Sequence, residues 1–183
     1  MLDKNMTKVE IEKELKNQGD YVQIDNITRF LKQNPALDVK KFLFAILIQI
    51  YDRRKMFAEA ADTCGKLIEI IMNPDEKSVC LKKEVEFYIK AGFFDKADAV
   101  FRRALSEIKP NERPKLSLEI REFYKRQADS YEKEKRRSLA VKTYEKILTL
   151  DIPEFEKKEV NEKLIKLYKE LGMVGEYMRL AKK

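Results

Sequence analysis

The side chains that could do chemistry in this chain are carboxylates, cysteines and clustered basic residues. The carboxylates include the pairs Glu84/Glu86 and Glu132/Glu134, but the sequence has no histidine, the commonest general base and metal ligand. Because 39% of the residues are charged, such pairs are typical of solvated helix faces. Nucleotide-binding glycine patterns and nucleophile elbows do not occur. We therefore expect a protein that is not an enzyme and that binds no cofactor and no metal ion.

Two cysteines, Cys64 and Cys80, are spaced like neither a zinc site nor a disulfide framework. Both fall where a helical repeat would bury a small apolar side chain, so we expect packing thiols in a reducing compartment, the cytoplasm. The first residues include no apolar stretch typical of a secretory signal. The longest apolar run, residues 42–51, is too short to cross a membrane, so no membrane partner is expected.

Basic residues are concentrated between Lys109 and Lys146, where twelve Lys and Arg accompany seven Asp and Glu. The excess forms a basic edge patch, by which we mean Arg126, Lys133, Lys135, Arg136 and Arg137. Such a patch could bind phosphates or an acidic protein, although few aromatic residues lie nearby for base stacking. Alternatively, the run is a solvated helix end in which Glu132 and Glu134 are ion-pair partners.

The elements that carry these residues are predicted to be helices. Only five glycines and five prolines occur in 183 residues, which leaves little room for long loops or hairpins. Three prolines, each with acidic residues nearby, are placed as in the first turn of a helix: Pro74, Pro114 and Pro153. Three glycines are placed as left-handed caps between the two helices of a pair: Gly19, Gly92 and Gly172.

One fragment recurs along the chain, and its clearest copy is Tyr88, Gly92, Phe94, Ala97, Phe101 and Ala104. Its anchors are Leu15, Tyr51, Tyr88, Tyr131 and Tyr168, which lie 36, 37, 43 and 37 residues apart. A period of this length indicates stacked helix pairs. The six extra residues between the third and fourth anchors are expected in a connecting loop, bracketed by Pro110 and Pro114.

This fragment resembles the tetratricopeptide repeat family, whose pattern its six residues fill at the expected spacing. The resemblance covers roughly residues 5–183 and is strongest in the three middle units, and end repeats of such arrays are commonly eroded. It implies an all-α fold, a right-handed α-solenoid of about five antiparallel helix pairs forming a single domain over residues 1–183. The units are approximately residues 5–37, 38–73, 74–112, 113–152 and 153–183.

In the resembled family, function comes from the concave surface that the first helix of each pair lines. Transferring the groove positions of the family gives the candidate contacts Phe42, Ala45, Gln49, Lys82, Glu86 and Ile89, to which we add the apolar Ile46. Some members of the family clamp a carboxylate with lysine and asparagine on these helices. The ninth positions here contain no asparagine, so that clamp is incomplete.

Residues 42–51 are apolar around the whole helix except at Gln49, and such a helix must be covered on every side. Either neighbouring helices cover it completely, or Phe42, Ala45 and Ile46 remain exposed and dock an apolar peptide or partner helix. Self-association through the same residues would satisfy the pattern equally well.

The sequence thus favours a non-enzymatic interaction or scaffold module that binds a protein or peptide partner in its groove. One alternative is a nucleic-acid-binding helical-repeat protein that uses the basic turn from Lys133 to Arg137. Another is an assembly subunit or homodimer.

Overall fold

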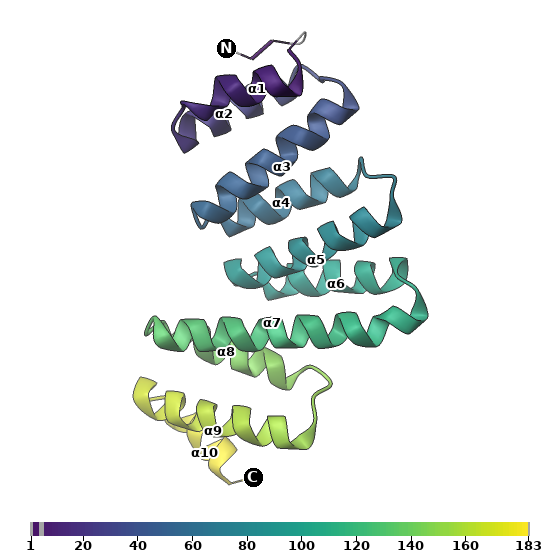
Figure 1. The fold of residues 1–183 in the computed structure, drawn as a ribbon. Helices are drawn as coiled ribbons and strands as arrows, with labels where there is room; N and C mark the ends of the chain where they lie inside the picture. The colour runs from purple at the N-terminus through teal and green to yellow at the C-terminus, as the bar shows by residue number, and fades with distance from the viewer. Residues whose placement is uncertain (1, 4–5, 183) are drawn as a thin grey trace. The chain divides into compact units, whose positions relative to one another are not determined.

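The computed structural model describes residues 2–3 and 6–182, and within these residues the chain is all helical, with ten α-helices and no β-strand (Figure 1). This confirms the predicted all-α class. The chain forms two compact parts, an N-terminal part that ends at Glu107 and a C-terminal part that begins at Ile108. The predicted single repeat domain spans both parts and stays a prediction. Among the described residues, no helix combines the length and the apolar character that a membrane span requires.

The described residues of the N-terminal part form α1 (Lys8–Lys16), α2 (Asp20–Leu31), α3 (Leu37–Arg53), α4 (Phe57–Ile68), α5 (Pro74–Ala91) and α6 (Phe94–Glu107). From α2 to α6, each helix packs against the next one in the chain. The first helix joins them through an apolar core that contains Leu15 of α1, Ile27 of α2 and Leu43 of α3. The three helices therefore share one core.

The described residues of the C-terminal part form a short 3₁₀ helix η1 (Pro110–Glu112), then α7 (Arg113–Lys133), α8 (Arg137–Leu148), α9 (Glu154–Leu171) and α10 (Val174–Ala181). Here too, each α-helix packs against the next one in the chain. Tyr124, Tyr131 and Tyr144 are the largest fully buried side chains of this part. Two of these rings, Tyr131 and Tyr144, lie at positions of the recurring sequence fragment.

The turn between the two helices of a pair is built in the same way four times. In each turn, the backbone N–H five residues after the anchor tyrosine donates to the carbonyl oxygen of that tyrosine, as in a Schellman cap. The donor and acceptor pairs are Met56 with Tyr51, Phe93 with Tyr88, Arg136 with Tyr131 and Met173 with Tyr168, at 2.8–2.9 Å. The residue before each donor has a positive φ, namely Lys55 (58°), Gly92 (77°), Lys135 (58°) and Gly172 (68°). The period of the sequence therefore matches a repeated backbone turn.

The first helix pair has a different turn. Helix α1 ends at the cap residue Asn17, and Gly19 has a φ of −67° and precedes α2 as its N-terminal cap. The prediction of a left-handed cap is wrong for Gly19 and confirmed for Gly92 and Gly172. At Gly19 the backbone is in a region that any residue can adopt, so the chain does not need glycine there.

The prolines mark helix starts, as predicted, with one difference. Pro74 is the first residue of α5, where the Asn73 side chain accepts hydrogen bonds from two backbone N–H groups of the first turn. Pro114 is the second residue of α7, and its ring is tolerated there because that N–H would have no partner within the helix. Pro153 lies one position earlier than predicted and caps α9.

The six extra residues between Tyr88 and Tyr131 lie in helices and not in a loop. Tyr131 comes 18 residues after the start of α7, whereas Tyr88 and Tyr168 come 14 residues after the starts of α5 and α9. Helix α6 has 14 residues, whereas α4 and α8 have 12 each. The prediction of a longer loop is therefore wrong. The physical reason is that Leu116 and Ile120 continue the buried stripe of α7 toward its N-terminus, so helical packing stabilises the added residues.

Candidate partner-binding groove

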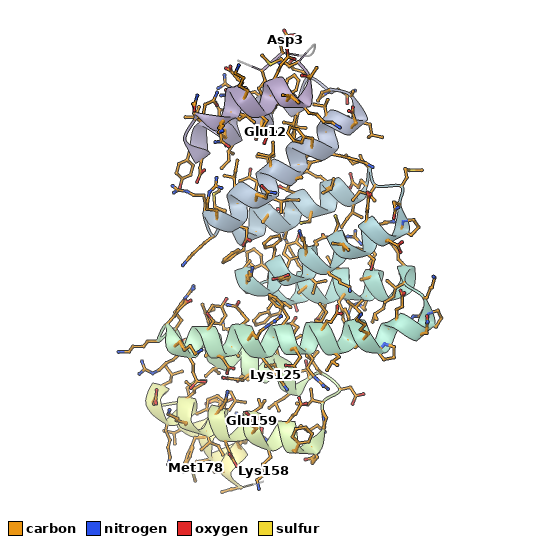
Figure 2. All side chains as sticks on the ribbon, viewed as in Figure 1. Asp3, Glu12, Lys125, Lys158, Glu159 and Met178 are labelled. Carbon is orange, nitrogen blue, oxygen red and sulfur yellow. The ribbon has the colours of Figure 1, made fainter. Side chains whose placement is uncertain are left out.

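A groove of about 690 Å³ lies in the N-terminal part, between α1 and α3. Its lining consists of Val9, Glu12, Lys13, Leu15 and Lys16 of α1, Gln23 of α2, and Phe42, Ala45, Ile46 and Gln49 of α3. Figure 2 labels Glu12, which marks the α1 wall of the groove. Four of the seven candidate contacts from the sequence are thus brought together on α3, which forms the floor of this groove.

The floor of the groove is apolar because α3 has apolar residues on more faces than the core can cover. Leu43 and Leu47 are buried in the core with α1 and α2. Phe42 and Ile46 are only half-buried, and Ala45 is exposed. Of the two alternatives that the sequence left open for residues 42–51, the structure therefore has the partly exposed helix.

The α1 wall presents charged residues above this floor. Glu12, Lys13 and Lys16 are exposed, and Glu12 and Lys13 lie four and three residues before Lys16, one turn away on the same side of the helix. On the same side Val9 is 75% exposed and extends the apolar surface. An apolar floor with a charged rim is the usual build of a protein-binding surface.

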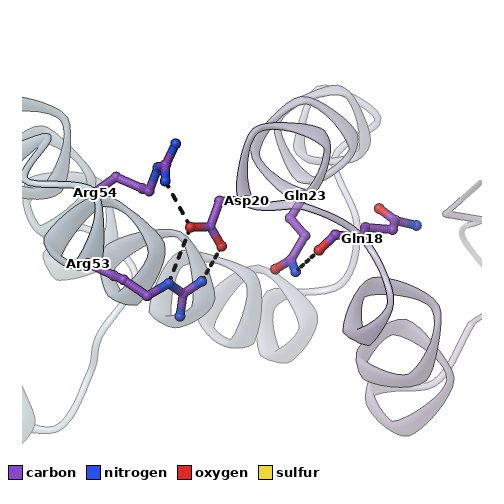
Figure 3. A network of polar contacts seen from close by, with 5 residues as sticks. All are labelled: Gln18, Asp20, Gln23, Arg53 and Arg54. Atoms are coloured by element: carbon purple, nitrogen blue, oxygen red, sulfur yellow. Dashed lines mark hydrogen bonds and ion pairs between the residues drawn. The ribbon is translucent and has the colours of Figure 1, made fainter.

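Polar contacts at the start of α2 join it to α3 and to the turn before it (Figure 3). The Arg53 guanidinium on α3 donates to both oxygens of Asp20 on α2, and Arg54 is paired with the same carboxylate at 3.7 Å. The hydrogen bond from Arg53 holds the pKa of Asp20 below its usual value. The Gln23 carboxamide, which lines the groove, donates to the backbone oxygen of Gln18 at 2.7 Å. This hydrogen bond therefore holds the Gln23 side chain, which is part of the groove lining, against the turn between α1 and α2.

The three candidate contacts on α5 do not line this groove. Lys82 and Glu86 are half-buried, and Glu86 is ion-paired with Lys90 at 3.5 Å. Ile89 is 0% exposed, so it is a core residue and its assignment as a partner contact is wrong. The reason is that α5 packs against both α4 and α6, which buries three consecutive residues, Phe87, Tyr88 and Ile89.

The groove residues of α1 and α2 were not among the predicted contacts. Val9, Lys13 and Lys16 follow the three- and four-residue spacing of one helix face, and this spacing is a signal that could have identified them. The pattern of α1 alone does not show that the face meets α3 across a groove. That arrangement depends on the packing of α1, α2 and α3 around a shared core.

The basic edge patch in the C-terminal part is largely occupied by contacts of its own. The Arg137 guanidinium binds Glu170 at 2.5 Å, and Arg136 pairs with Glu134 at 3.5 Å while it stacks on the ring of Tyr131. Arg126 stacks on the ring of its neighbour Phe123. The remaining two members, Lys133 and Lys135, are exposed. Two of the five positive charges, those of Arg136 and Arg137, are therefore paired with acidic residues beside the patch.

The two carboxylate pairs are likewise engaged in structural contacts. Glu84 is buried and accepts a hydrogen bond from Arg103, and burial raises its pKa while Arg103 opposes that rise. Glu132 accepts a hydrogen bond from the Tyr144 hydroxyl at 2.7 Å. Within residues 2–3 and 6–182, no group of three or more histidine, cysteine, aspartate or glutamate side chains could hold a metal ion.

The two cysteine thiols differ in how deeply they are buried. Cys64 is fully buried and Cys80 is half-buried, and burial raises the pKa of Cys64 to about 12. Because the thiolate is the reactive form, Cys64 is inert at neutral pH.

Comparison of the chain with protein-family models, with curated proteins and with solved structures gave no significant match.

Proposed function

We propose that this chain is a non-enzymatic protein-interaction module, which binds a peptide or a partner helix in the groove between α1 and α3. The observation that carries the proposal is the accessible apolar floor of Phe42, Ala45 and Ile46 beside the charged rim of α1. The repeated turn at Tyr51, Tyr88, Tyr131 and Tyr168 supports the finer proposal, a right-handed solenoid of about five antiparallel helix pairs similar to tetratricopeptide repeats.

The size of the floor limits what can bind there. From Phe42 to Gln49, α3 advances about 10 Å, or two helical turns. A partner segment of similar length places two or three apolar side chains on this floor. Because packed helices form the walls, the module loses little conformational entropy when the partner binds.

The test compares two identical substitutions on exposed helix positions of the N-terminal part. Ala45→Glu places a carboxylate in the floor of the groove, and Ala99→Glu places the same group on α6, away from it. We expect affinity capture from the source lysate to lose its partner with Ala45→Glu and to keep it with Ala99→Glu. Direct binding of the captured protein should then weaken at least ten-fold, which corresponds to about 1.4 kcal/mol.

Circular dichroism of both variants checks that the helices are intact. A partner that binds the Ala45→Glu variant as tightly as the parent protein would disprove the groove proposal.

The alternative function, nucleic-acid binding, is tested at the basic edge patch. Binding to RNA that decreases steeply with salt and is lost in Arg136→Glu/Arg137→Glu would favour the alternative function instead.

A further inference from the structure

A second groove, of about 780 Å³, lies in the C-terminal part along α9. The residues that matter for its chemistry are Leu148, Phe155, Lys157, Asn161, Ile165 and Leu180. Phe155 is 71% exposed, and Ile165 and Leu180 are half-buried. Figure 2 labels Lys158, which lines this groove, and Glu159, which follows it on α9. The groove is independent of the one between α1 and α3.

The corresponding positions of another helix pair show how far these side chains are buried elsewhere in the chain. Counted from the anchor tyrosine, Ile165 and Leu180 correspond to Val85 and Val100 in the pair α5/α6. Both valines are buried, and so is Leu81, the counterpart of Asn161. The same surface is therefore closed in the pair α5/α6 and open in the pair α9/α10.

The end of α6 closes that surface in the pair α5/α6. The last residue of α6, Glu107, binds Lys77 in the first turn of α5 at 2.7 Å, so the end of α6 lies beside the start of α5. One turn earlier, Ala104 is fully buried and Leu105 is half-buried. Relative to its tyrosine, α6 ends after 19 residues, and α10 ends after 13 in the part of the chain that the structure describes. Asn161 and Ile165 line the groove there and are half-buried.

The counterpart of Lys77 is present in the open pair. Lys157 lies at the same distance before its tyrosine and lines the groove, but its ion pair is with Glu154 on its own helix, at 3.2 Å. That carboxylate is almost fully exposed, and a pair of this kind contributes little to stability. Lys157 can therefore exchange it for an acidic group on another molecule.

We propose that the groove along α9 binds a helical segment of a partner protein that ends like α6, with small and aliphatic residues followed by an acidic residue. The aliphatic residues cover Phe155, Ile165 and Leu180, and the acidic residue binds Lys157. Asn161 lies in the lining as a polar residue, and its Oδ1 is buried without a hydrogen-bond partner among the described residues. A second copy of this chain is a poor donor, since its own segment 104–107 is packed on α5.

The experiment uses the full chain and a stapled synthetic peptide with the sequence of α6, residues 94–107. Staples hold the peptide helical, which a free segment of this length is not. We expect chemical-shift changes in the isotopically labelled protein at Phe155, Ile165 and Leu180, with a dissociation constant below about 1 mM. Phe155→Asp should weaken binding more than ten-fold, and Met72→Asp, at an even more exposed apolar residue, should leave it unchanged.

A charge reversal tests the role of Lys157. Lys157→Glu should weaken binding of the peptide about five-fold, and a Glu107→Lys peptide should recover most of that loss with the Lys157→Glu protein only. Three results would overturn the proposal: no binding at about 1 mM, shifts confined to α5, or binding that Phe155→Asp does not change. A dimer that Phe155→Asp converts to monomer would also overturn it, since the occupant would then be a second copy. None of these results depends on the groove between α1 and α3.

Discussion

In the pair α5/α6 the second helix runs for 14 residues, from Phe94 to Glu107, whereas in the pair α9/α10 it runs for eight, from Val174 to Ala181. The two pairs are otherwise built alike. Each has a glycine in the left-handed region at the turn, and each has a tyrosine whose carbonyl oxygen closes that turn. In each, the tyrosine hydroxyl also donates to a carboxylate of the preceding helix, Tyr88 to Asp62 and Tyr168 to Glu145.

The difference shows that two features of a helix pair, its turn and the cover of its apolar surface, are independent. The turn and the tyrosine contacts set how the first helix of a pair meets its neighbours, and they are intact in both pairs. The apolar surface is instead covered by the last turn of the second helix. This cover is complete beside Leu81 and Val85 and missing beside Asn161 and Ile165. A helix pair can therefore keep its turn and its tyrosine contacts and still expose an apolar surface.

The largest expected effect is a difference in the cost of core truncation. Leu81→Ala removes a fully buried side chain and leaves a closed cavity, so the free energy of unfolding should fall by about 3 kcal/mol. Ile165→Ala acts at a half-exposed position on the open groove, and the loss should be about 1 kcal/mol. Urea denaturation followed by far-ultraviolet circular dichroism measures both values.

The comparison fails if the two losses are equal. Equal losses would mean that the surface along α9 is as well covered in solution as the surface along α5. Analytical ultracentrifugation of the parent protein and of Phe155→Asp serves as the control, because self-association would cover Ile165 without any change in the fold.

The fold could be predicted from the sequence where residue type and backbone conformation agree. Gly92 and Gly172 are in the left-handed region that glycine favours, and the sequence predicted both caps. Lys55 and Lys135 adopt the same conformation, at a cost of about 1 kcal/mol each for a residue with a Cβ, and no residue type marks them. The repeat imposes this conformation through the tyrosine contacts, so only the period shows where the turn lies.

The candidate site could be predicted in part, because helix register assigns faces but not coverage. Register placed Phe42, Ala45 and Gln49 on one face of α3, and they do line one groove. It also placed Ile89 on a binding face, but α5 is packed on both sides and buries it. The groove along α9 depends on where a helix ends, and element ends are the least reliable feature that a sequence predicts.

A smaller effect is expected at the turns, where the two pairs should differ again. Gly92→Ala places a Cβ in the left-handed region and should cost about 1 kcal/mol, because α6 is packed along its length and cannot relax the turn. In the short helix α10, which has no fully buried residue, local fraying relieves the strain, so Gly172→Ala should cost about half as much. Thermal unfolding of both variants measures the difference. A loss of stability for Gly172→Ala as large as the loss for Gly92→Ala would mean that α10 is held as firmly as α6.

The smallest effect at neutral pH concerns the tyrosine contacts, which should behave alike in the two pairs. Burial and the hydrogen bond to Asp62 raise the pKa of Tyr88, and burial and the bond to Glu145 raise that of Tyr168. In the unfolded chain a tyrosine ionises near pH 10. Their contribution is therefore fully present below about pH 10 and is lost as the pH rises toward the folded-state pKa values.

We expect Tyr88→Phe and Tyr168→Phe each to reduce the loss of stability between pH 9 and pH 11 by a similar amount, as measured by urea denaturation at each pH. Single substitutions are compared with the parent protein at the same pH, which removes the background from lysine deprotonation. A change for Tyr88→Phe alone would show that the tyrosine of the open pair is not held in solution. The pair α9/α10 would then be weaker at its turn as well as at its uncovered surface.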